Sequence, residues 1–499
     1  MTYAQDYSAT TTEAHSPMRS PTSDTTHMSH IQSRGYPNPG SKEEDEVASS
    51  ERGDPEKGRP APLEFATYSF WSKELAEKRA FYLKGIFGFT TMICLLIWGI
   101  VSIYWGSLYK EIDQSPNIKG WIINRDSSSS GAGTIGEAVT QALLAANNGP
   151  KPHSTWQVVD PSLYPTSTDV NRAISYDEAV WVVVEVASDA TARFLQARAD
   201  GDASWDPTAV VQLVYATARN QNVVPSMIVA PATKTLSAAL SRLGAQLAAQ
   251  YLPTISNNAT ALQNLVRAPQ TISSPLVLGN RDLVPYDSPV AIAPTFVGLI
   301  YLCILAFNVT MANMALRAGL QPYLRLKSLV AMRFLVPIVA YIFISLMFSL
   351  LNIPFDVTFG RRWSYGAGFM VWWSTSFVGM TVLGLATEAI LSLVGPKFIG
   401  FGLLLWLIVN VSVANFPIEL SPSFYKYGYS MPFYNLKQIY VSIIFDTGKP
   451  VLILKYMGIL WAWLLVILIT FPIWIWRERK EEQKLQRQKQ EVVSKGEKI

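Results

Sequence analysis

The sequence predicts a polytopic α-helical membrane protein with six transmembrane helices and a large extracytoplasmic α/β domain between the first helix and the other five. One observation is a set of long uncharged apolar stretches, each close to the ~20 residues that a helix needs to cross a bilayer core. Another is composition: of 499 residues, 49% are hydrophobic and only 16% are charged, below the roughly 25% typical of soluble domains. The third is the region 107–288, which instead alternates short apolar runs with helical patterns.

The six predicted spans coincide with the long apolar stretches. Core helices of soluble proteins are rarely so long and so uniformly apolar, which makes a soluble protein the weaker alternative. The spans lie near residues 86–106, 292–314, 334–351, 363–387, 398–418 and 451–476.

The predicted orientation follows from lysines and arginines, which gather on the cytosolic side of membrane proteins. They cluster before the first span, between the second and third spans, and after the sixth, so both termini are predicted to be cytosolic. Arg361 and Arg362 oppose this orientation, because they then face outward. The predicted organisation is a disordered cytosolic tail (1–63), an interfacial helix with the first span (64–106), an extracytoplasmic α/β domain (107–288), a five-helix domain (289–476) with an outer loop (419–450), and a charged cytosolic tail (477–499).

The predicted α/β domain consists of apolar, β-branched strands separated by helices. This alternation is typical of a sheet with both faces covered by helices. Asn258 begins the tripeptide Asn-Ala-Thr, an N-glycosylation acceptor on the predicted extracytoplasmic side. Strands are predicted over 117–124, 179–186 and 208–216, and helices over 135–147, 168–175, 189–198 and 229–251.

A dinucleotide-binding pattern occurs in this domain. The stretch SSSSGAGTIGEAV (127–139) contains Gly131, Gly133 and Gly136 as a literal G-x-G-x-x-G, and Asp160 follows at about the distance of a ribose-binding acid. In that fingerprint the first glycine comes directly after the strand, whereas RDSSSS intervenes here. The predicted extracytoplasmic side is also not where NAD is a usual cosubstrate. We therefore interpret the stretch as a serine-glycine loop, and no cofactor is predicted.

The sequence gives no support for catalysis. Three of the four histidines lie in the N-terminal tail, and the fourth, His153, lies in a predicted loop. No His, Cys, Asp and Glu cluster has metal-ligand spacing, and the serine-rich stretches lack a nearby histidine that would activate a nucleophile. The net charge of +4 is too small to indicate nucleic-acid binding. An enzyme, a metal site and catalytic residues are therefore not predicted.

The stretch between the fifth and sixth predicted spans, NFPIELSPSFYKYGYSMPFYN (415–435), is rich in prolines and aromatics. Pro422 and Pro432 should keep the residues before them out of the helical region, so the segment should break into short pieces. Phe424, Tyr425 and Tyr429 suit the depth of the lipid headgroups. The segment is therefore either an interfacial plug or a lid over a lateral opening.

Charged residues flank the predicted spans. Glu388 and Lys397 bracket the turn between the fourth and fifth spans and are expected at the inner interface. Because ion-coupled transporters usually carry acids or histidines near the midplane, a pathway for small cations is not expected. Any cargo should instead be amphipathic or lipid-like.

Three features together resemble a known family. They are the order of one span, a large outer domain and five spans, the stretch IINRDSSSSGAGTIGEAV (122–139), and the stretch 415–435. They resemble the nitrosoguanidine-resistance membrane proteins of fungi and the bacterial phage-infection-protein type, which is related to ABC-2 exporter permeases. The resemblance covers roughly residues 65–476 and implies a plasma-membrane protein linked to resistance to toxic compounds. The sequence contains no G-x-x-x-x-G-K-[ST] motif, so coupling to ATP would need a separate ATPase.

The leading functional hypothesis is an ABC-2-permease-like protein that contributes to export of, or resistance to, amphipathic toxic compounds, or to lipid distribution. The alternative is a non-transporting scaffold or regulator whose outer domain binds a partner. Membrane lipids are the expected partners, with a separate ATPase or regulatory protein and a homo-oligomer left open. The expected location is the plasma membrane.

Overall fold

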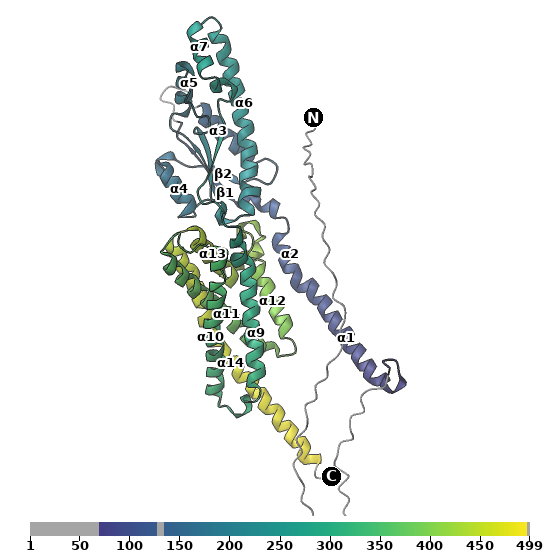
Figure 1. Ribbon diagram of the computed structural model, residues 1–499. Coiled ribbons are helices and arrows are strands. Elements are labelled where there is room, and N and C mark those ends of the chain that lie inside the picture. Colours follow the sequence, from purple (N-terminus) through teal and green to yellow (C-terminus); the bar gives the residue numbers. More distant parts are fainter. Residues whose placement is uncertain (1–68, 127–133, 497–499) are drawn as a thin grey trace, which may run out of the picture. The chain divides into compact units, whose positions relative to one another are not determined.

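The computed structural model describes residues 69–126 and 134–496 (Figure 1). The chain divides into two compact units, residues 1–76 and 77–499. In the first unit the described residues 69–76 include one short 3-10 turn, Lys73–Leu75. The tail predicted to be disordered (1–63) and the residues 127–133 of the serine-glycine stretch lie outside the described residues, so those two interpretations stay predictions.

One mixed five-stranded sheet lies in the second unit, with the strand order β2-β1-β3-β4-β5 (Figure 1). β1 is parallel to β2 and β3, β4 is antiparallel to β3, and β5 is parallel to β4. The three predicted strands are confirmed as β1, β3 and β4. The strands not predicted, β2 and β5, are the two edges, whose residues are less enclosed and show a weaker apolar pattern. The bounds are Lys119–Asn124 (β1), Thr155–Val158 (β2), Val182–Val186 (β3), Val211–Tyr215 (β4) and Leu278–Asp282 (β5).

Helices cover both faces of the sheet, as the alternating sequence predicts. Side chains of neighbouring strand residues point to opposite faces. Ile122 and Val184 belong to a core with three helices, α3, α5 and α6. Ile123 and Val183 belong to a second core that includes α4 and continues into the apolar helices downstream. The helices span Thr134–Ala146 (α3), Ser167–Ser175 (α4), Ala190–Asp200 (α5), Ala230–Ile255 (α6), Ala259–Arg267 (α7) and Gln270–Ser273 (α8).

Five helical stretches among the described residues are long and apolar enough to cross a membrane: Lys73–Leu108, Pro289–Arg317, Leu326–Phe355, Tyr365–Val394 and Pro450–Gln488. They coincide with five of the six predicted spans, so the chain is a polytopic helical membrane protein. The helices within them are Ala76–Leu96 (α1), Ser102–Leu108 (α2), Gly298–Arg317 (α9), Leu326–Leu350 (α10), Tyr365–Val394 (α11) and Pro450–Gly496 (α14).

The remaining predicted span, 398–418, forms a helix of only 13 residues, α12 (Ile399–Val411). At 1.5 Å per residue this helix is about 20 Å long, shorter than the ~30 Å core of a bilayer. The helical hydrogen bonding stops after Ser412 although the sequence stays apolar, and Pro417 then lies in an extended conformation. A long sixth helix was therefore wrongly predicted at this place.

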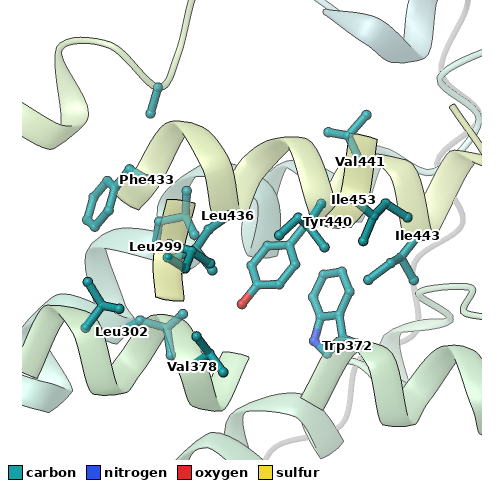
Figure 2. Packing of buried hydrophobic residues seen from close by; sticks show 14 of the residues in the cluster. Leu299, Leu302, Trp372, Val378, Phe433, Leu436, Tyr440, Val441, Ile443 and Ile453 are labelled. Atoms are coloured by element: carbon teal, nitrogen blue, oxygen red, sulfur yellow. The ribbon is translucent and has the colours of Figure 1, made fainter. Parts of the chain in front are cut away.

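The region predicted as an outer loop, 419–450, contains a buried helix, α13 (Pro432–Phe445). Pro432 is its first residue, a position where the missing N–H costs nothing, and the side chain of Asn410 accepts the N–H of Phe433 at 3.2 Å. Figure 2 shows Leu436 and Tyr440 of α13 among residues of α9, α11 and α14. The Tyr440 ring stacks on Trp372 with 4.0 Å between ring centroids. α13 is mostly apolar, as expected of a helix that other helices largely enclose.

Candidate functional site

A polar cavity lies where the α/β layer meets the helix bundle, and we call it the junction cavity. Its volume is about 230 Å³. Its walls come from the segment between α4 and β3, from the turn Thr217–Arg219, from residues 414–419, and from α13 and α14. Its charged lining residues are Asp177, Glu178, Arg219, Glu419 and Lys437, and its aromatic ones are Trp181, Phe416, Tyr434 and Tyr456.

Backbone and side-chain contacts hold the two sides of the cavity together. Asn220 donates its side-chain N–H to the carbonyl oxygen of Asn415 at 3.1 Å. The N–H of Gly448 donates to the carbonyl oxygen of Ser175 at 2.8 Å. Asn117, which precedes β1, donates to the carbonyl oxygen of Glu419 at 3.0 Å. The cavity therefore lies between parts of the chain joined by directional bonds as well as by apolar packing.

Lys437 is a buried cation at the bundle side of this cavity. Its Nζ donates to the carbonyl oxygens of Ala414 at 2.8 Å and Asn415 at 2.9 Å. Among the described residues no carboxylate forms an ion pair with it. Its side chain is partly accessible because it lines the cavity, while protein surrounds it otherwise. Burial disfavours the charged ammonium and lowers the pKa of Lys437 to about 8.

Arg219 supplies a second cation from the α/β side. Its guanidinium lies over the ring of Trp181, 4.1 Å from the ring centroid, and donates to the carbonyl oxygen of Val180 at 2.5 Å. The stacking and the hydrogen bond fix the plane of the guanidinium. No carboxylate within the described ranges forms an ion pair with Arg219.

The acids of the cavity differ in their partners. Asp177 is neutralised by Lys449, with 2.5 Å between Nζ and Oδ1. Glu178 and Glu419 form no ion pair with any described residue. Glu178 also holds a φ of 51°, a region that non-glycine residues adopt at a cost and often near functional sites. The hydroxyl of Tyr429 donates to Glu419 at 3.4 Å, and burial together with this carboxylate raises the pKa of Tyr429 to about 12.

A second charged cluster lies inside the bundle, at the end of α9 and α11 away from the junction cavity. Glu388 of α11 is fully buried and pairs with Arg317 of α9 and with Arg333 of α10, the latter at 3.3 Å. Arg333 also bonds Ser392 at 2.6 Å and pairs with Glu478 of α14 at 2.7 Å. We call these residues the charge network. It joins four helices through two cations and two acids, so the buried charges balance.

The sequence placed Glu388 and Lys397 together at an interface, and the structure separates them. Glu388 has no exposed surface, whereas Lys397 is exposed and lies over the ring of Phe398. The reason is that α11 continues past Glu388 to Val394, which leaves Glu388 on a face covered by α9 and α10. Glu388 therefore lies inside the candidate span Tyr365–Val394 rather than beside it, and the placement of Glu388 and Lys397 at the inner interface stays a prediction.

The proline-rich segment forms the predicted short pieces. Ile418–Leu420 and Ser423–Ser430 are 3-10 turns, and the residues before Pro422 and Pro432 are extended. Tyr425 is 6% exposed and donates its hydroxyl to the carbonyl oxygen of Ile103 in α2 at 2.6 Å, whereas Phe424 is 70% exposed. Tyr429 is half-exposed. The segment is therefore anchored on α2 through one ring and presents the neighbouring ring outward, and its role as a lid or a plug stays a prediction.

Because only one of the two neighbouring aromatic side chains is buried, they should contribute differently to the free energy of unfolding. Tyr425→Ala should lower the free energy of unfolding by about 3 kcal/mol, because it removes a buried ring and a hydrogen bond. Phe424→Ala should change it by no more than about 0.5 kcal/mol. The melting temperature and folded yield of the two variants in detergent measure the difference. Equal losses in both variants would show that the segment does not pack in this way.

In the glycine-rich stretch, the helix N-terminus is occupied by the protein's own carboxylate. Asp126 accepts the N–H of Gly136 at 3.0 Å and the N–H of Thr191 at 2.9 Å. A Cβ at Gly136 would overlap the side chain of Asn124, which explains this glycine by close packing. In a dinucleotide site these N–H groups would face a phosphate. The geometry of the described part of this stretch therefore agrees with a structural loop, and Gly131 and Gly133 lie outside the described residues.

Asn258 is the N-terminal cap of α7, and its side-chain oxygen accepts the N–H of Ala261 at 3.1 Å. Asn258 and Thr260 are both exposed. The amide nitrogen, to which a glycan would be attached, is not used by this cap. Glycosylation of Asn258 stays a prediction.

The sequence did not single out the residues of the junction cavity. Lys437 lay in the predicted outer loop, and Arg219 and Glu178 lay between predicted elements. One signal was present: Lys437 is a single charge within the apolar stretch LKQIYVSIIF, where a charge is costly unless it has a role.

Comparisons with known proteins support the membrane assignment. The family described as "Protein of unknown function (DUF3533)" matches residues 89–469. The chain is similar to the uncharacterized endoplasmic reticulum membrane protein YJR015W of Saccharomyces cerevisiae, at 24% identity over 404 residues, covering 76% of this chain and 78% of that protein. No solved structure matches. Since the match extends over most of the chain, from α1 to α14, the protein belongs to the DUF3533 family of membrane proteins.

Proposed function

We propose that the protein moves amphipathic molecules across or between the leaflets of its membrane, as an exporter of toxic compounds or a distributor of lipids, with the junction cavity as its binding site. The observation that carries this proposal is the polar, charged cavity at one end of a bundle whose spans are mostly apolar. An amphipathic molecule needs such a pair of environments, because its polar end is costly to bury in apolar surroundings. The resemblance to ABC-2 permeases and resistance proteins agrees with this function.

The proposed topology has six passages, five long and one short. α12 leads from the turn after α11 to residues 414 and 415, which contact Lys437 at the junction cavity. It thereby connects the two ends of the bundle despite its length. Six passages put both termini on one side, which the lysines and arginines identify as cytosolic. The α/β layer and the junction cavity then face the cell exterior or the lumen of the endoplasmic reticulum.

The two arginines that opposed this orientation have acidic partners. Arg361 pairs with Asp287 at 2.6 Å, and Arg362 pairs with Asp446 at 2.5 Å. The ion pairs give these arginines a structural role at their positions. The two arginines are also fewer than the lysines and arginines before the first span, between the second and third, and after the last, so the overall distribution still favours cytosolic termini.

Reconstitution tests the proposed function. Purified protein in liposomes should speed the movement of a fluorescent phospholipid, of a cationic amphipathic dye, or of both, relative to protein-free liposomes. Lys397→Gln changes an exposed residue outside the junction cavity, and this control variant should move the probes at the wild-type rate. Rates are measured by quenching of probe in the outer leaflet, with and without ATP and an imposed pH gradient. Protein-free rates for every probe under every condition would contradict transport and favour the scaffold or regulator.

A further inference from the structure

We infer that the junction cavity binds a zwitterionic group in which a phosphate is linked to an ammonium, as in the headgroup of a phospholipid. This inference rests on the proposed function and names the class of molecule that the site selects. It follows from the charges that the cavity leaves without partners, from the common lining to which they belong, and from the space that this lining encloses.

The phosphate end is assigned to Lys437 and Arg219. An ammonium has three N–H donors, and two of those on Lys437 are used by the carbonyl oxygens of Ala414 and Asn415. The third has no acceptor among the described residues, and Lys437 lines the cavity. A buried cation without a counter-charge is costly, and an anionic ligand removes that cost. Arg219, fixed on Trp181, adds the planar donor group that suits phosphate oxygens.

The ammonium end is assigned to Glu178 and Glu419. Neither carboxylate has an ion-pair partner among the described residues, unlike Asp177 beside them, which pairs with Lys449. Tyr434 and Tyr456 line the same cavity and offer aromatic rings, which attract ammonium groups. Glu178 lies on the α/β side, as Arg219 does, and Glu419 lies in the turn Ile418–Leu420, whereas Lys437 lies on α13.

Charge balance and size select a zwitterion over a simple ion. Two unpaired cations and two unpaired acids line the cavity, so a ligand of one sign would satisfy one pair and be repelled by the other. The volume of about 230 Å³ far exceeds the ~10–15 Å³ that one water molecule requires, so a small headgroup fits. Leu452 and Tyr456 belong to the membrane-spanning α14 and border the cavity, which favours a lipid over a soluble phosphate compound.

Binding by the purified full-length protein in detergent tests the inference. Four probes are titrated calorimetrically: short-chain phosphatidylethanolamine, soluble phosphoethanolamine, inorganic phosphate and ethanolamine. We expect the lipid and phosphoethanolamine to bind at least about tenfold more tightly than phosphate or ethanolamine, because each simple ion uses only half of the site. Phosphoethanolamine binding as tightly as the lipid would assign the site to a soluble ligand. No preference for the zwitterions would overturn the inference.

Three variants separate the two ends of the site. Lys437→Met should weaken binding of phosphoethanolamine by at least about tenfold, whereas Lys426→Met, at an exposed lysine of the same region, should not. Glu178→Gln should weaken the binding of phosphoethanolamine but leave the weak binding of inorganic phosphate unchanged. Should Lys437→Met fail to fold, Glu178→Gln, at a half-buried position outside the bundle, still decides the question. Equal affinities for wild type and Glu178→Gln would overturn the assignment of the ammonium end.

The outcome is separable from that of the proposed function. Zwitterion binding without movement of any probe in liposomes would reject transport and keep the binding site. Movement of lipids and dye at rates independent of headgroup and of Lys437 would reject the binding site and keep transport.

Discussion

Glu388→Gln is expected to destabilise the helix bundle by about 3 kcal/mol and to reduce the yield of folded protein sharply. Glu388 is the acid between Arg317 and Arg333, and all three side chains are buried. Without the charge of this acid, Arg317 keeps no ion-pair partner among the described residues, and Arg333 keeps only Glu478, which is partly exposed. An uncompensated buried charge costs more than the ion pair itself contributes. The melting temperature in detergent and the folded fraction after size-exclusion chromatography measure the effect.

Two further variants show that the cause is charge balance. Glu481→Gln, on the exposed surface of α14, should keep the wild-type melting temperature. Arg317→Met combined with Glu388→Met removes one cation and one acid together, leaves Arg333 with Glu478, and should recover much of the stability lost in Glu388→Gln. Wild-type stability of Glu388→Gln would contradict the charge network as a structural element.

Gly368→Ala is expected to destabilise the protein by about 1–3 kcal/mol, although alanine favours helices. Gly368 lies in the first turn of α11, and a Cβ there would overlap the backbone carbonyl oxygen of Phe359 in the preceding loop. The loop must then move, and with it the buried ring of Phe359, which packs edge-on against Trp372. Thermal unfolding in detergent measures the change.

Gly366 provides the matched control two residues earlier in the same helix. A Cβ there meets no atom within 4 Å, so Gly366→Ala should be neutral or slightly stabilising. A similar melting temperature for the two variants would contradict the close approach of α11 to the loop before it.

The long helices and central strands were predictable because their signals are local. Apolar length alone identifies α9, α10, α11 and α14, and runs of β-branched residues identify β1, β3 and β4. The edge strand β5 reads LGNRD and carries no such run. Helix α12 was predicted too long, because hydropathy does not show where Ser412 and Pro417 turn the chain.

Helix α13 escaped prediction for a different reason. It is too short for a span, follows a proline-rich stretch and carries Lys437, so that it looks like part of a loop in the sequence. Only the helices around it show that it is enclosed. The same holds for the candidate sites: Glu388 and Arg333 are 55 residues apart in the chain, and the junction cavity combines residues from both the α/β layer and the bundle. Such combinations depend on tertiary packing, which local sequence patterns do not contain.

The central claim is that the α/β layer and the junction cavity face the extracytoplasmic side, and glycosylation tests it most directly. In fungal cells, the wild-type chain should carry a glycan that endoglycosidase removes, and Asn258→Gln should lack it. A second acceptor, made in that variant by Gln483→Asn with Leu485→Thr on the exposed end of α14, should stay unmodified. The claim would be contradicted by a wild-type chain without a glycan together with a glycan on the α14 acceptor of the variant.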